Sequence, residues 1–465
     1  MIRAYRPFTT TVRALSLLMV PLAMLLVSTA TLAQTMASSV SQHGITWYFD
    51  QEYQVGRYAN GDWWVLGPVT ITRITPESET ITDPHTGEDR PVNGSMLNPN
   101  GHVNGWDGYY IGIFVSYNQS LDVNPSRNGP LSVATGSIVS SISRISSNIG
   151  GSNRAALDVF AILTVVDTAP PSGAFRPNPY GTDKTSYWNE SMLDYGVLQS
   201  LEPVANTPNL ASVTDSVSGF WNDHMATAGT GWFRQQAYTA HTMQRSYGRD
   251  IGNQSADALL SLHLNYTNEQ KRDLLVHVVQ KGIDIYGMQQ LSGEWSNNGG
   301  HYGSQKARLA FAAIALNDPG MKSALDAADH FVHGMDQQTF FVSQADVDRV
   351  SCNDNDPSST SGNQCGTSGA SLYESADLGM PEWGRSHHTA ACRFDCRDWG
   401  AAYRWIGASY AGNTLAVELL PEARQLWNWE PVFEYSRRYV DVGGSGLSSF
   451  VVEMYQNYAD LAPIP

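Results

Sequence analysis

The feature that most constrains the fold is a change of hydrophobic periodicity partway along the chain. Between residues 44 and 166, short β-branched and aromatic runs such as 45–49 and 159–166 alternate with turns such as Asn60-Gly61-Asp62. Runs of this kind are typical of β-strands. After about Pro208 the apolar residues recur instead at helical spacing. The chain therefore predicts a β-rich part followed by a helical part.

The helical part is predicted to form the larger domain. Strands are expected over 45–49, 63–65, 69–74, 109–115 and 159–166, and helices over 257–264, 269–289, 305–316, 322–335, 399–411 and 415–427. Thr267 and Gln270 fit a capping box at the start of the second helix. Because long polar loops separate the helices, they favour an incomplete α/α toroid of helical hairpins, and hence a mainly α fold, over a plain helical bundle. A proline-rich connection at 169–179 separates a β-rich region over 34–180 from an α/α-toroid catalytic domain over 181–465.

The first 33 residues have the features of a secretory signal peptide. Arg3, Arg6 and Arg13 precede an apolar run over 14–27, and small residues end at Ala33. The alternative, an uncleaved membrane anchor, is disfavoured by this small-residue end. Cleavage after Ala33 predicts a periplasmic or secreted protein without stable membrane insertion, because no later stretch is long and apolar enough to span a bilayer.

Four cysteines agree with export to an oxidising compartment. Cys352 and Cys365 bracket a polar loop, and Cys392 and Cys396 lie close together in the chain. We expect two disulfide bonds rather than a zinc site, because the spacing lacks paired C-x2-C knuckles. Sequential pairing is favoured among the three pairings that four cysteines allow.

The chain is acidic, with a formal net charge of -16 that becomes -19 once the three arginines of the signal are removed. A nucleic-acid binder would carry a basic face, so no nucleic-acid partner is expected. An acidic chain also repels a polyanion, although physiological salt screens that repulsion beyond about 8 Å. An anionic polysaccharide as substrate therefore requires a local basic cleft.

The densest polar stretch is the loop over 293–306, which leads into a strongly apolar helix. Asn298, His301 and Tyr302 lie within it, and Lys306 and Arg308 follow closely. Free N–H groups and the dipole at the helix N-terminus favour anions there. We interpret this loop as part of a binding or catalytic site, the alternative being a structural loop with satisfied caps.

Two further polar clusters accompany this loop. The first comprises Asn222, Arg234, His241, Arg245 and Arg249. His241 and Arg245 are four residues apart and so share a helix face. The second comprises Arg385, His387 and His388. The paired histidines suggest a metal, but no carboxylate lies at a typical helical ligand spacing, so neither a metal nor another cofactor is expected.

Four motifs in order carry a resemblance to a known family. They are Tyr-Gly-Arg-Asp-Ile-Gly over 247–252, Asn-Gly-Gly-His over 298–301, Gln-Thr-Phe-Phe-Val over 338–342 and Pro-Glu-Trp-Gly over 381–384. This order resembles secreted bacterial α/α-toroid polysaccharide lyases, most nearly polysaccharide lyase family 38, which act on glucuronan and alginate. The resemblance runs from about Thr214 to the C-terminus. It implies β-elimination from a uronate polymer, with a Tyr as proton-transfer group and Asn, His and Arg around the uronate.

Lyase chemistry removes the C5 proton of a uronate, so donors must take up the charge that develops on the neighbouring carboxylate. Tyr302 is the predicted base and acid, His241 its rival or partner, and Asn298 and His301 are predicted donors. A phenol with an ordinary pKa near 10 needs a neighbouring Arg or protonated His to act at neutral pH. The predicted substrate-binding residues are Asn222, Arg234, Arg245, Arg249, Lys306, Arg308, Arg385 and His387.

Two other functions stay open at this point. A toroidal glycoside hydrolase needs two carboxylates about 5–10 Å apart across the scissile bond. Its candidates are Glu294, Asp336, Glu374 and Glu382. A non-catalytic glycan-binding protein would use tryptophans as stacking platforms, although tryptophans in strands are more often core residues. Its candidates are Trp47, Trp63, Trp64 and Trp106.

Overall fold

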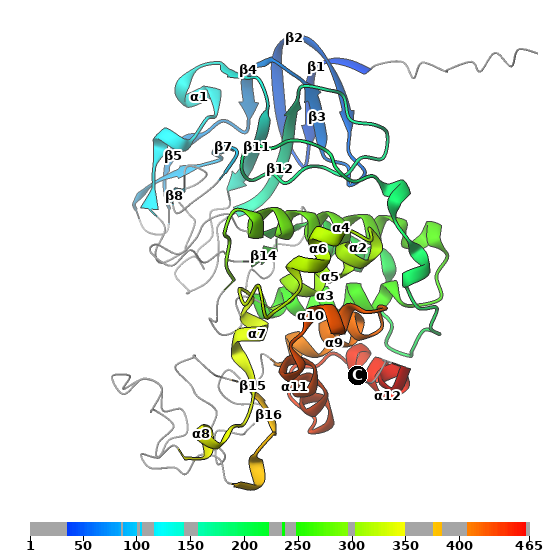
Figure 1. Ribbon diagram of the computed structural model, residues 1–465. Coiled ribbons are helices and arrows are strands. Elements are labelled where there is room, and N and C mark those ends of the chain that lie inside the picture. The colour runs from blue at the N-terminus through cyan, green and yellow to red at the C-terminus, as the bar shows by residue number, and fades with distance from the viewer. Residues whose placement is uncertain are drawn as a thin grey trace, which may run out of the picture. The chain divides into compact units, whose positions relative to one another are not determined.

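An eight-stranded sheet forms the first part of the structure, and helices follow it along the chain (Figure 1). The computed structural model describes residues 35–84, 87–99, 103–104, 116–143, 157–222, 235–237, 248–295, 303–348, 375–383 and 407–461. The strands are β1 (Thr35–Gln42), β2 (Ile45–Arg57), β3 (Trp63–Leu66), β4 (Val69–Thr75), β5 (Glu79–Thr82), β6 (Asp89–Val92), β7 (Ser95–Leu97), β8 (Val103–Asn104), β9 (Ser116–Tyr117), β10 (Leu131–Val133), β11 (Gly136–Ser143), β12 (Leu157–Val166), β13 (Phe220–Asn222), β14 (Gln235–Ala237), β15 (Thr339–Phe341) and β16 (Pro381–Trp383). The helices are α1 (Pro125–Asn128), α2 (Leu210–Ser218), α3 (Gly248–Leu262), α4 (Asn268–Gln290), α5 (Gln305–Ala315), α6 (Pro319–Ala324), α7 (Gly334–Gln338), α8 (Gln344–Val347), α9 (Ala408–Glu418), α10 (Ala423–Trp427), α11 (Glu430–Asp441) and α12 (Ser449–Tyr458).

The sheet is mixed and curls into a half-barrel. Its strand order is β10-β4-β2-β3-β12-β11-β7, and β1 pairs with β2 off this path. Strands β12 and β3 pair in parallel, with Leu163 opposite Trp63, whereas the other described pairs of this sheet are antiparallel. One apolar core joins residues from these strands, among them Trp47, Ile71 and Leu163.

Alternation along β11 and β12 gives the sheet a second apolar face. Ile138 and Leu163 belong to the core of the strands, whereas Val139 and Ile162 belong to the core of the helices. Successive side chains of a strand point to opposite faces, which explains this division. Helices therefore cover one face of β11 and β12, and the candidate site described below lies where the two meet.

The predicted fold class, a mainly α incomplete α/α toroid, is wrong. The N-terminal region is a curled mixed half-barrel, and the described helices do not form a dominant toroid. The helix predicted over 415–427 is interrupted between α9 and α10, because Pro421 cannot continue a helix. The helix predicted over 322–335 is also interrupted, since the Asp326 carboxylate accepts a hydrogen bond from the Ala328 N–H and holds a turn.

Several local predictions are confirmed. Strands β2, β3, β4 and β12 cover the segments expected to be extended. Thr267 accepts a hydrogen bond from the Gln270 N–H, and the Gln270 side chain accepts one from the Thr267 N–H, so the capping box of α4 is present. The strand predicted over 109–115 lies outside the described residues.

Helices α4 and α5 pack closely because a glycine lies at their contact. A Cβ atom at Gly282 would lie 2.5 Å from the Cβ of Ala312 and 2.6 Å from the carbonyl oxygen of Arg308. Both distances are shorter than van der Waals contact, so only glycine permits this approach. The approach places Arg308 next to the face of α4 that carries the candidate site.

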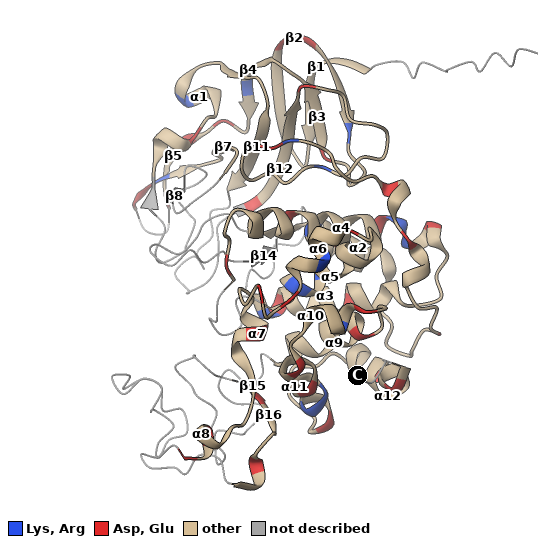
Figure 2. Ribbon diagram, in the orientation of Figure 1, with Lys and Arg blue, Asp and Glu red and all other residues tan. Residues whose placement is uncertain are grey.

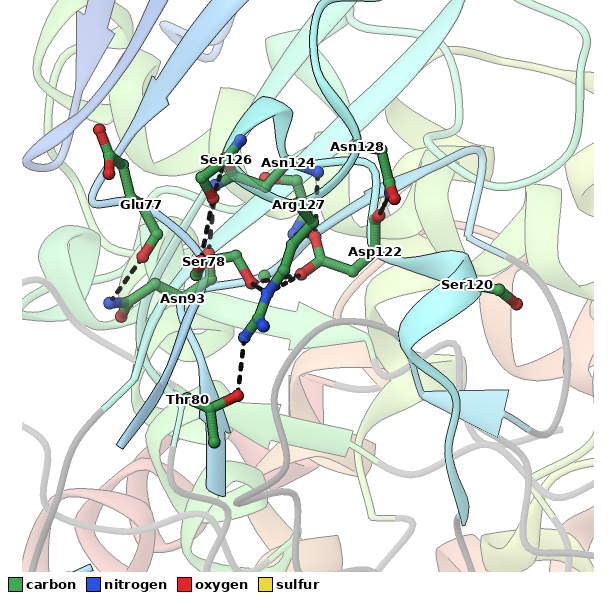
Figure 3. A network of polar contacts seen from close by, with 12 residues as sticks. Glu77, Ser78, Thr80, Asn93, Ser120, Asp122, Asn124, Ser126, Arg127 and Asn128 are labelled. Carbon is green, nitrogen blue, oxygen red and sulfur yellow. Dashed lines mark hydrogen bonds and ion pairs between the residues drawn. The ribbon is translucent and has the colours of Figure 1, made fainter. Parts of the chain in front are cut away.

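A polar network fixes residues 118–128 against the strands (Figure 3). The buried Asp122 carboxylate accepts hydrogen bonds from the Ser78 hydroxyl and from the Ser95 and Asn124 N–H groups. Arg127 donates to Ser78 Oγ at 3.0 Å. Burial raises the pKa of Asp122 against these donors. Because the polar groups of this network form hydrogen bonds with one another, we assign the network a structural role.

Charged residues lie on strands and helices alike (Figure 2). Among the residues that the structure describes, no helix is long and apolar enough to cross a membrane. The predicted signal peptide over 1–33 lies outside them. It stays a prediction, as do secretion and the division into regions over 34–180 and 181–465.

The fully buried His263 predicts a loss of stability in mild acid. Its Nδ1 accepts from the Gln199 N–H and its Nε2 donates to the Ala416 carbonyl, so the ring is neutral. Burial lowers the pKa of His263 from 6.5 to about 3. The unfolded chain therefore takes up this proton near pH 6.5 and the folded chain does not. We expect His263 to remove about 2 kcal/mol of unfolding free energy between pH 7 and pH 5.

Urea unfolding at the two pH values measures this loss. The variant His263→Gln, which cannot take up the proton, should lose about 2 kcal/mol less than the wild type over the same interval. Equal losses in both proteins would contradict the assignment of a neutral His263.

Candidate functional site

A polar pocket of about 450 Å³ lies between the sheet and the helices. The β1–β2 turn, the β2–β3 turn and β12 line it on one side. The end of α2, β13 and one face of α4 line it on the other. Ligand pockets typically enclose about 300–1,000 Å³, so this pocket has room for a sugar.

Helix α4 presents three ionisable side chains to the pocket. His277, Lys281 and Asp284 are spaced four and three residues apart and all line it. Residues at this spacing lie on one face of a helix. The neighbouring positions of α4, such as Leu274 and Val278, are fully buried in the helical core. The sequence of α4 therefore places a polar stripe within the largely apolar stretch from Leu274 to Ile285.

Lys281 is the most unusual member of the stripe. Its side chain is only 6% exposed, and its Nζ lies 5.6 Å from the centroid of the Phe160 ring. Among the described residues, its ammonium group has no hydrogen-bond or ion-pair partner within contact distance. Burial lowers the pKa of Lys281 to about 8, although Asp284 and Asp62 oppose that effect. The group is still mainly charged at neutral pH.

His277 lies one helical turn before Lys281. Burial, with a further contribution from the Lys281 charge, lowers the pKa of His277 to about 4. The imidazole is therefore neutral at pH 7, with one nitrogen able to accept a proton. No described residue forms a hydrogen bond with its ring. The pocket thus places a neutral proton acceptor beside a cation.

An ion-pair triad forms one wall of the pocket. Arg176, which is 1% exposed, donates from Nε to Asp62 at 2.6 Å and from Nη2 to Asp284 at 2.7 Å. Burial would raise the pKa of Asp62, but Arg176 and hydrogen bonds from Asn60 and Gln42 lower it below its ordinary value. Burial raises the pKa of Asp284 against the opposing charges of Arg176 and Lys281.

Aromatic and exposed polar groups complete the pocket. The rings of Phe160 and Trp221 lie 4.8 Å apart between centroids and form an apolar wall. Arg57 lies at the exposed rim, with its guanidinium 3.9 Å from the centroid of the Trp63 ring. Asp215 is also exposed there. A sugar has one face to stack and many hydroxyls to bond, which suits such a mixed lining.

Most of the site residues predicted from the sequence lie outside the described residues. They are the catalytic candidates Tyr302, His241, Asn298 and His301, the binding candidates Arg234, Arg245, Arg385 and His387, and the cysteines Cys352, Cys365, Cys392 and Cys396. Their roles and the two disulfide bonds stay predictions.

The structure does place four of the predicted binding residues. Asn222 is buried beside the pocket, with its amide nitrogen 3.4 Å from the Lys281 carbonyl oxygen. Arg249 pairs with the adjacent Asp250. Lys306 is fully buried and pairs with Asp336 at 2.5 Å, and Arg308 is fully buried near the Phe220 ring. Through its contact with Lys281, Asn222 touches a residue of the pocket lining.

The candidates for the two alternative functions are scattered. Asp336 and Glu382 are fully buried, whereas Glu294 is exposed. Glu374 and Trp106 lie outside the described residues. Trp47 and Trp64 are core residues, and Trp63 packs beneath Arg57. None of the described carboxylates in this set lines the pocket.

Sequence reasoning missed His277, Lys281, Asp284 and Arg176. The first three could have been found from the sequence, because polar residues at positions i, i+4 and i+7 interrupt the largely apolar stretch of α4 from Leu274 to Ile285. Such a stripe has to face either solvent or a buried polar site. Arg176 lies in the proline-rich connection, where the sequence indicates only a linker.

Comparisons with protein-family models, with curated proteins and with solved structures found no match to this chain.

Proposed function

We propose that the protein is a secreted polysaccharide lyase that cleaves a uronate-containing polysaccharide, such as glucuronan or alginate, by β-elimination in this pocket. One observation carries the proposal. The neutral imidazole of His277 lies one helical turn from the Lys281 ammonium, and both line the same pocket. An acceptor for a proton beside a cation is what elimination from a sugar acid requires.

The reaction assigns a task to each group. His277 accepts the C5 proton, and the electron pair of the C5–H bond forms the C4–C5 double bond. The C4–O bond breaks, and the departing glycosidic oxygen takes up the proton that His277 received. Between removal of the C5 proton and loss of the glycosidic oxygen, negative charge builds on the carboxylate of the uronate. The Lys281 ammonium stabilises that charge. Each positioned proton transfer contributes about 10²–10⁴ in rate.

A pKa of about 4 makes His277 a weak base in the empty pocket. A bound carboxylate changes this, since a nearby negative charge favours the protonated imidazole and raises its pKa. The base therefore strengthens when an anionic sugar is bound. Tyr302, the base predicted from the sequence, remains the alternative candidate for removing the C5 proton.

The activity is tested by incubating the purified protein with glucuronan, with alginate and with a neutral glucan. We expect ultraviolet absorbance from the new C4–C5 double bond with at least one uronate polymer and none with the glucan. New reducing ends without absorbance would refute elimination and indicate hydrolysis. Neither signal with any of these polymers would also refute the proposal.

A glycoside hydrolase is the second candidate function, and one observation favours it. Asp62 and Asp284 line the same pocket, and their pKa values are shifted in opposite directions. Two carboxylates whose environments separate their pKa values are typical of a glycosidase acid and base. Both, however, bind Arg176, which makes them less accessible to substrate than His277 and Lys281.

A further inference from the structure

We infer that Lys281 is the carboxylate-binding residue of the pocket, and that the pocket selects sugars with a free carboxylate over neutral sugars. This inference rests on the proposed function only for identifying the ligand as a sugar. A charge removed from water is normally paired or hydrogen-bonded. The Lys281 side chain is nine-tenths buried, it lines the pocket, and the described residues offer it no partner within contact distance. An anion bound in the pocket would form an ion pair with the Lys281 ammonium group.

The nearby carboxylates do not supply that anion. Asp62 and Asp284 both bind the guanidinium of Arg176 in contact, so their charges are largely used there. A further buried cation, Arg308, acts on Lys281 from α5. The charged and titratable groups that act on Lys281 are Asp284, Asp62, Arg176, Arg308 and His277. His277 is neutral at pH 7, so Lys281, Arg176 and Arg308 are three cations against the two carboxylates of Asp284 and Asp62. This excess of positive charge favours an anionic ligand.

The lining around Lys281 fits a sugar ring better than a small inorganic anion. Phe160 and Trp221 offer apolar surface beside the ammonium group. Ser41, Asn60 and Ser218 bring polar groups to the same pocket. A pocket of about 450 Å³ is also far larger than a phosphate or chloride ion needs.

Binding of D-glucuronate and of its uncharged methyl ester tests this inference without involving cleavage, because neither monosaccharide has a glycosidic bond. Titration calorimetry at pH 6.5 should show that the wild type binds glucuronate about tenfold or more tightly than the ester. Lys281→Met should abolish this preference and Lys281→Arg should keep most of it. Lys271→Met, on the same helix but outside the pocket lining, should behave like the wild type.

A measurement on the wild type alone covers the case in which Lys281→Met fails to fold. Above pH 8 Lys281 loses its proton in the empty pocket. Glucuronate affinity should then fall by up to about tenfold per pH unit, while ester affinity stays level. A preference that survives in folded Lys281→Met, or that does not change with pH, would overturn the inference. These outcomes are independent of whether the polymers are cleaved, so the two proposals can fail separately.

Discussion

Replacing Arg176 with Met is expected to lower the free energy of unfolding by about 3–5 kcal/mol. The substitution leaves the carboxylates of Asp62 and Asp284 without the guanidinium that now binds both of them. Asp284 is buried, so its uncompensated charge would be costly. Because Asp62 belongs to the β2–β3 turn and Asp284 to α4, the loss should also loosen the contact that shapes the pocket. Urea unfolding at pH 7 measures the change.

Two variants control this experiment. Arg73→Met removes one member of an exposed ion pair with Glu77 and should cost less than about 1 kcal/mol. Adding Asp62→Asn and Asp284→Asn to Arg176→Met removes the orphaned charges and should recover part of the loss. If Arg176→Met is as stable as Arg73→Met, the triad does not hold the sheet and α4 together.

Replacing His277 with Gln is expected to lower kcat for elimination by about 10²–10⁴ with little change in melting temperature. Glutamine keeps a polar side chain in the pocket but cannot take up the C5 proton. In the wild type, kcat/KM should fall below about pH 4, where His277 gains a proton, and above about pH 8, where Lys281 loses one. The acid limb should disappear in the residual activity of His277→Gln.

His330→Gln, the same change outside the pocket lining, should keep wild-type activity. Tyr302→Phe distinguishes the two proposed bases. A folded Tyr302→Phe that is inactive, together with an active His277→Gln, would move the reaction from the pocket to the loop over 293–306. An inactive His277→Gln and an active Tyr302→Phe would confirm the pocket as the site.

The local structure was more predictable than its assembly. The runs that became β2 and β12 and the capping box at Thr267 depend on neighbouring residues, and the sequence predicts them correctly. The toroid prediction was wrong because the helical spacing of apolar residues continues past Pro421 and Asp326, whereas the helices end before them, at Glu418 and Ala324. Periodicity reports which face is apolar but not where a helix is interrupted.

The candidate site was less predictable for a different reason. The turn at Asn60-Gly61-Asp62 and the stripe on α4 are more than two hundred residues apart, and only the folded chain brings Asp62 toward Lys281 and Asp284. Each looks ordinary by itself, the first as a surface turn and the second as a few polar residues in a long helix. The polar residues of the loop over 293–306 are contiguous in the sequence, so the sequence favours that loop as the site instead.

The parallel pairing of β3 with β12 has a consequence for how the chain folds during synthesis. Leu163 of β12 lies opposite Trp63 of β3, so β3 gains its second neighbour only after a further hundred residues have been synthesised. Contacts between such distant positions slow folding. Until then a nascent chain exposes the aromatic edge of β3, and open edges of this kind invite aggregation. A recombinant fragment that ends before β12 would leave the edge of β3 unpaired. Fragments chosen for expression should therefore include β12 and extend beyond Val166.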